Sequence, residues 1–81
     1  MDKRIAQIGI IVEETDSVEK LNNLLHEYGE NIIGRMGIPY REKNISIISI
    51  VIHAEQDIIS TLAGKLGMLE GISVKTIYSK K

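Results

Sequence analysis

The sequence contains no cysteine, no tryptophan and no phenylalanine, and it has one proline. Without cysteine the chain cannot form disulfides, thiolate metal sites or cysteine nucleophiles, which suits a reducing compartment such as the cytoplasm. A strong net charge is also lacking, because ten Lys and Arg oppose eleven Asp and Glu. Proteins that bind nucleic acid or anionic membranes usually need a basic surface. We therefore predict no direct nucleic-acid partner and no membrane partner.

Long hydrophobic runs are absent as well. No apolar stretch approaches the roughly 18 residues that a membrane-spanning helix needs, and the first residues show no leader-like apolar segment. We therefore expect a soluble cytoplasmic protein. Its 81 residues suggest a single domain over 1–81, near the size at which folding buries only about 60% of the unfolded chain's surface. So small a core is marginal, and oligomerisation is an expected source of further stability.

What is present is a clear alternation of strand-like and helix-like segments. Strands rich in Ile and Val are predicted over residues 4–12, within 31–44, and over 44–54 and 72–78. Helices with one apolar face are predicted from Asp16 or Ser17 to about Tyr28 and between Glu55 and Leu66. The order βαββαβ indicates a ferredoxin-like α+β fold, in which two helices cover one face of a four-stranded antiparallel sheet of order 4-1-3-2.

The helix ends carry recognisable signals. Asp16 and Glu19 have the spacing of a capping box at the start of the first helix. Gly67, just after the second helical segment, is a candidate for a terminating residue in the left-handed conformation.

The segment 31–44 is unusual for a strand, because it holds two glycines, the proline and two arginines. These residues suit an edge strand. A three-residue loop over 42–44, with Asn44 left-handed, would pair Arg41 with Ile45. That register points these residues toward the helices: Ile32, Met36, Ile38, Tyr40, Ile48, Ile50 and Ile52. It points these toward the helix-free face: Ile33, Arg35, Gly37, Arg41, Ile45, Ser49 and Val51. The same parity places Gly9 and Ile11 on the helix-free face.

The helix-free face is then predicted to be apolar. Its apolar members are Ile5, Ile11, Ile33, Ile45, Ile47, Val51 and Ile77. Soluble monomers rarely expose apolar patches larger than a few hundred Å², so a second copy of the chain is the expected cover. We predict a homo-oligomer, either a dimer or a tetramer, whose interface contains Ile11, Ile45, Ile47 and Val51.

A candidate binding site lies at the centre of this predicted face. Gly9, Gly37 and Ser49 leave little side-chain bulk there and could form the floor of a pocket. Arg35 and Arg41 could clamp a carboxylate or phosphate, because a guanidinium offers a planar pair of donors. The alternative is that both charges only protect an edge strand from aggregation.

No catalytic, metal or cofactor site is predicted. His26 and His53 have no cysteine or second histidine at ligand spacing, although His53 from two chains could meet between subunits. Two histidines form no Ser-His-Asp pattern. The glycines of GRMG and GKLG do not open a helix, as a phosphate loop requires. We therefore expect a protein that is not an enzyme.

The segments LNNLLHEYGENIIGRMGIPYREKNISIISIVI and LAGKLGMLEGISVKTIYSK resemble a small bacterial family described as regulators of the iron-only hydrogenase system. The most specific pieces are Gly34–Arg41, Leu62–Gly67 and Gly71. The resemblance implies an ACT-like, ferredoxin-like fold similar to the effector-binding C-terminal half of nickel-responsive repressors. It also implies a regulatory link to hydrogenase expression or maturation. The ribbon-helix-helix half and the cysteine-histidine nickel set of those repressors are absent, so neither operator binding nor nickel sensing is carried over.

Two interpretations remain. The first is an ACT-like regulatory module that binds a small effector or a partner protein through an oligomeric sheet surface. The second is a purely structural oligomerisation subunit that binds no ligand. A ligand that raises the melting temperature would separate them.

Overall fold

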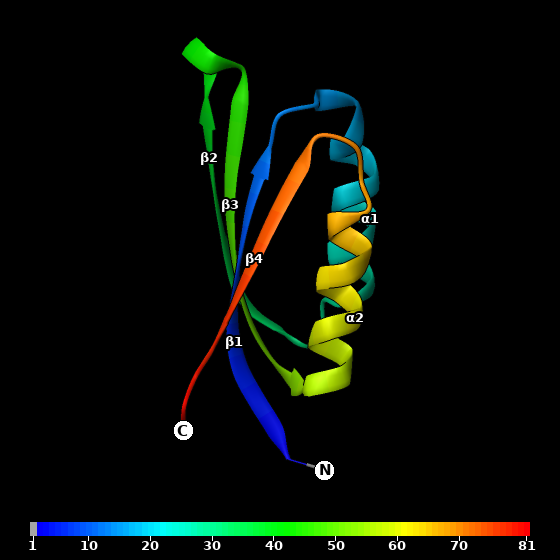
Figure 1. Cartoon of the computed structure of the whole chain (residues 1–81), viewed down its shortest axis with the longest axis vertical. Helices are drawn as coiled ribbons and strands as arrows, with labels where there is room; N and C mark the ends of the chain where they lie inside the picture. Colours follow the sequence, from blue (N-terminus) through cyan, green and yellow to red (C-terminus); the bar gives the residue numbers. More distant parts are fainter. Residues whose placement is uncertain (1) are drawn as a thin grey trace.

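The computed structural model describes residues 2–81, and its elements follow the predicted order. The strands are β1 (Lys3–Val12), β2 (Ile32–Tyr40), β3 (Ile45–Glu55) and β4 (Ile72–Tyr78); the helices are α1 (Val18–Glu27) and α2 (Gln56–Gly67). The strands form one antiparallel sheet of order β2-β3-β1-β4, and both helices cover the same face of it (Figure 1). This confirms the predicted ferredoxin-like fold and strand order. Within the described residues 2–81, no helix is long and apolar enough to cross a membrane.

The core lies between the helices and the two central strands. Because side chains alternate along a strand, every second residue of β1 and β3 points toward the helices. The largest fully buried side chains are Ile8, Ile10, Leu21, Ile50, Ile52, Ile59, Leu62 and Leu66. Burying one such side chain stabilises the fold by about 1.5–3 kcal/mol. The predicted core positions of β1 and β3 are therefore confirmed.

The helix ends differ from the prediction. A 3-10 turn (Thr15–Ser17) runs directly into α1, and the N-cap residue Ser17 has helical backbone angles and no side-chain capping bond. The predicted capping box of Asp16 and Glu19 is therefore wrong. The buried hydroxyl of Ser17 instead donates to the carbonyl oxygen of Glu70, 2.6 Å away.

The predicted left-handed terminator is also misplaced. Gly67 is still part of α2, and the residue after it is helical. The glycine with positive φ is Gly71, at 72°, where the chain turns into β4. A Cβ atom at Gly71 would overlap the side chain of Glu14. Gly71 therefore lets the segments before α1 and β4 approach closely, and the carbonyl oxygen of Gly71 accepts a bond from the Glu13 N–H at 2.7 Å.

The register of β2 is the largest departure. Tyr40, not Arg41, pairs with Ile45, because four residues rather than three form the hairpin loop. Asn44 is left-handed as predicted, with φ 55°. The one-residue difference exchanges the two faces of β2. Met36, Ile38 and Tyr40 point to the helix-free side, opposite the prediction, and Arg35 and Gly37 pair with the inward-facing Ile50 and Ile48.

An irregularity near the start of β2 shifts the ladder by one residue, so that Ile32 faces the helices as predicted. The ladder shifts between Ile32 and Gly34, so Ile33 is an extra, bulged residue that is 63% exposed. Ile32 consequently pairs with Ile52 and packs against the core, as expected.

Candidate functional site

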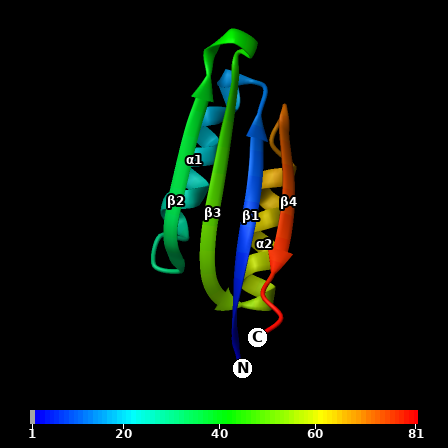
Figure 2. The same cartoon turned by 90° about the vertical axis from the view of Figure 1, so that its left-hand side faces the viewer.

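The helix-free face of the sheet is a candidate binding surface. Figure 2 shows this face with all four strands in front and both helices behind. Its large apolar side chains are exposed: Ile5, Ile11, Met36, Ile38, Tyr40, Ile47, Val51 and Ile77. The predicted interface residues Ile11, Ile45, Ile47 and Val51 all lie here, and the corrected register adds three apolar side chains from β2. Their role in an interface stays a prediction.

A shallow depression occupies the middle of this face. Gly9 of β1 lies between Ser49 of β3 and Lys75 of β4, and the hollow has a volume of about 400 Å³. Ile11 and Ile47 form its apolar wall. A Cβ at Gly9 would approach the carbonyl oxygen of Lys75 only to 3.8 Å, which is an ordinary contact. The glycine therefore opens the hollow without being needed for backbone packing.

The polar groups around the depression are few. The amide nitrogen of Gln7 donates to the Ser49 hydroxyl at 2.9 Å, and Ser73 and Lys75 come from the neighbouring edge strand. An ammonium group beside an apolar hollow can attract a negatively charged group on a ligand, while the hydroxyls can orient it. This arrangement suits the binding of a small ligand that has an apolar body and a negatively charged group.

Arg35 and Gly37 do not belong to this surface, contrary to the sequence prediction. Both lie on the helix side of β2, where an Arg35 Nη2 donates to the Asn22 Oδ1 of α1 at 3.2 Å. Arg41 lies in the 3-10 turn at the hairpin tip, outside the strand. Of the residues predicted for the central site, only Gly9 and Ser49 therefore line the depression.

Lys75 is the charged residue of the depression that sequence reasoning missed. The sequence held the signal, because Lys75 lies two residues before Ile77, which was itself predicted to lie on the helix-free face. Applying to this strand the parity used for the first strand would have placed Lys75 on the helix-free face.

The histidines lie apart from each other. His53 pairs with Ile5 on the helix-free side of β3, whereas His26 is in the last turn of α1. Within residues 2–81, no three His, Cys, Asp or Glu side chains gather closely enough to hold a metal ion.

Comparisons with known proteins give one family and several structural relatives. Residues 4–76 match the TM1266-like family, described as "Iron-only hydrogenase system regulator, putative". The structure of the uncharacterized protein TM1266 from Thermotoga maritima is 39% identical and covers 98% of this chain and 100% of that chain, with a TM-score of 0.94. No curated protein matches the chain.

More distant structures share the fold. The ACT domain of GTP pyrophosphokinase from Chlorobium tepidum is 18% identical, covers 100% of this chain and 91% of that chain, and has a TM-score of 0.72. The C-terminal domain of MgtC from Mycobacterium tuberculosis is 12% identical, covers 95% of this chain and 88% of that chain, and has a TM-score of 0.70. At these identities the likeness concerns the fold alone, which is ACT-like.

Proposed function

Because this chain belongs to the TM1266-like family, we propose that it is a regulatory module that binds a small effector or a partner protein through an oligomeric sheet surface. The module would act in the expression or maturation of an iron-only hydrogenase. This role requires binding and assembly and no chemical step.

The observation that carries the proposal is the apolar helix-free face. Ile47 is 47% exposed and Ile77 is 67% exposed, and the surrounding strands add further apolar side chains. Packing two such faces against each other would remove this surface from water, at about 25 cal/mol per Å² of apolar area. A second copy is the simplest occupant, since closed homo-oligomers reuse one surface on every subunit.

The depression over Gly9 supports effector binding at the same surface. Two flat faces that meet at Ile11 and Ile47 would leave the hollows around Gly9 between them. A small, mainly apolar molecule could fill that space, with an anionic group near Lys75. Such a ligand would touch both copies, so binding would favour the assembled state.

The test combines mass and thermal stability. Light scattering should give at least a dimer at micromolar concentration, and a screen of metabolites should identify a compound that raises the melting temperature with increasing concentration. A strictly monomeric mass with no partner present would contradict assembly through this face.

Gly9→Val separates effector binding from assembly. The new side chain meets only an ordinary contact at its Cβ, adds apolar area and projects into the floor of the hollow. We expect the mass of the oligomer to remain and the ligand-dependent stabilisation to disappear. If no compound stabilises the wild type while the oligomer persists, the structural alternative without a ligand is favoured.

A further inference from the structure

A second hollow lies on the opposite side of the sheet, between α1 and the β2–β3 hairpin. It consists of two adjoining spaces of about 260 and 90 Å³. Both are lined by Val12, Val18, Pro39 and Ser46, so they form one continuous groove. We call it the α1–hairpin groove. It shares no lining residue with the depression around Gly9 except Ile48, whose strand forms part of both surfaces.

The groove exists because β2 presents little bulk toward α1. Beyond Ile32, the inward-facing positions of this strand are Arg35, Gly37 and Pro39, and none of them covers the core below it as an isoleucine would. The groove floor is consequently apolar. Val12, Leu21 and Ile48 contribute to it, and these side chains are 2%, 0% and 8% exposed.

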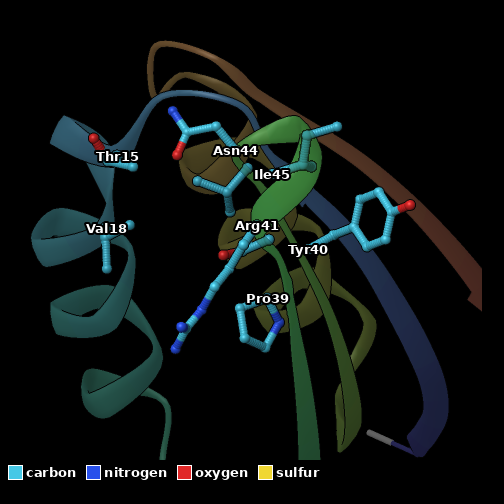
Figure 3. Close-up of a pocket in the computed structure, with 9 residues that line it drawn as sticks. Thr15, Val18, Pro39, Tyr40, Arg41, Asn44 and Ile45 are labelled. Carbon is cyan, nitrogen blue, oxygen red and sulfur yellow. The ribbon is translucent and has the colours of Figure 1, made fainter.

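Two guanidinium groups border the groove at different points along its length. Arg35 lines the larger space, and its hydrogen bond to Asn22 ties it to α1. Arg41 lines the smaller space at the hairpin tip. Figure 3 shows the Arg41 side chain running from the tip past Pro39 on the side of α1, while the Tyr40 ring points the other way.

Neither arginine is neutralised. Among residues 2–81, no carboxylate forms an ion pair with Arg35 or Arg41. The neighbouring Glu42 carboxylate accepts a bond from the Tyr40 hydroxyl at 3.1 Å, and Tyr40 points away from the groove. The α1–hairpin groove therefore combines an apolar floor with two cationic groups that lack an anionic partner.

We propose that the α1–hairpin groove binds a short aliphatic dicarboxylate. The two carboxylates would pair with Arg35 and Arg41, since a guanidinium makes a two-pronged contact with a carboxylate. The methylene chain would pack against Val18 and Pro39, which line both spaces and are more exposed than the floor. Arg35 and Tyr40 are five strand positions apart, on the order of 17 Å, and Arg41 follows in the hairpin turn, with its side chain extending back along the groove (Figure 3). The distance between the two guanidinium groups is therefore shorter than the distance along the backbone, and we expect one chain length to fit better than shorter or longer acids.

The ligand chemistry can be tested with a series of α,ω-dicarboxylates of about four to ten carbons. Affinity is measured by calorimetry or NMR titration on the wild-type chain, with monocarboxylates of equal length as controls. We expect an optimum at one length and at least a roughly tenfold advantage over the matching monocarboxylate, because one charge-assisted bond is lost. Absence of binding at millimolar concentration, or equal affinity for both types of acid, overturns the proposal.

Variants locate the site. Arg35→Ala and Arg41→Ala should each weaken binding of the best acid by roughly tenfold or more, and the lysine variants should recover only part of it. Gly37→Val should abolish binding, because its side chain enters the groove. Its Cβ would lie 3.9 Å from Ile48 Cγ1, an ordinary contact that leaves the fold intact.

The matched control is Gly34→Val. Gly34 belongs to the same edge strand, but it pairs with Val51 and a Cβ there meets nothing within 4 Å. Dicarboxylate binding should survive in this variant and in Gly9→Val. Equal loss in the Gly34 and Gly37 variants, or unchanged binding in Gly37→Val, contradicts a site in the α1–hairpin groove. Neither result depends on whether the helix-free face assembles.

Discussion

At the scale of single residues, Gly71 shows how one backbone conformation joins distant segments. Its positive φ and its contact with Glu14 leave no space for a side chain. Gly71→Ala should lower the free energy of unfolding by roughly 2 kcal/mol or more, because it adds backbone strain to a steric overlap. Urea unfolding measures this loss. A change below about 0.5 kcal/mol would show that the loop relaxes freely.

Gly64→Ala is the control for Gly71→Ala, because it changes the same residue type in a different setting. Gly64 lies inside α2, and a Cβ there has no neighbour within 4 Å. This substitution should stabilise the protein by about 1 kcal/mol, the difference in helix propensity. The two glycine variants are thus expected to change stability in opposite directions.

Ser17 illustrates what a local motif cannot predict. A serine before an apolar helix favours an N-cap, yet its hydroxyl bonds to Glu70 in the loop before β4. The 3-10 turn continues directly into the helix, so the side chain is available for a partner that is 53 residues away in sequence. Only the tertiary structure brings that carbonyl group into reach.

At the scale of the elements, β2 is the least buried strand. Eight of its nine residues are exposed and Ile32 is half-buried, whereas β1 and β3 bury alternate side chains. Native-state hydrogen exchange should therefore show β2 opening at a lower free energy than β1. A saturating groove ligand should slow exchange in β2. Equal protection of both strands in the unliganded protein would contradict this prediction.

The element order, the strand order and the inward residues of β1 and β3 were predictable because hydrophobic periodicity is strong in those segments. The two faces of β2 were not. Its register depends on whether Arg41 belongs to the strand or to the loop, and side-chain pattern does not decide between these. The apolar set Met36, Ile38 and Tyr40 would suit a core, but the structure turns it outward. Because of this error in register, the sequence analysis placed Arg35 on the helix-free face rather than in the α1–hairpin groove.

At the scale of the whole molecule, the exposed face predicts association. Ile47→Lys should weaken the oligomer by at least roughly tenfold, because assembly would bury an unpaired ammonium group. Its effect on the subunit fold should be small, since Ile47 points away from the helices. Light scattering across a dilution series measures the change. Asn23→Lys on α1, which adds the same charge on the helix side, should leave the mass unaltered; equal weakening by both variants would argue against this interface.

The four-residue hairpin loop also has a consequence for folding. Because β2 buries so little on either face, packing against the core selects its register only weakly. The geometry of the loop, with Asn44 at φ 55°, is then the main feature that aligns β2 with β3. A chain in which this alignment slips by one residue would bring Met36 and Ile38 against α1 and turn Arg35 outward. This competing hairpin would satisfy the hydrophobic pattern, but its α1–hairpin groove would lack Arg35. The loop geometry therefore decides which of two chemically different surfaces the chain presents.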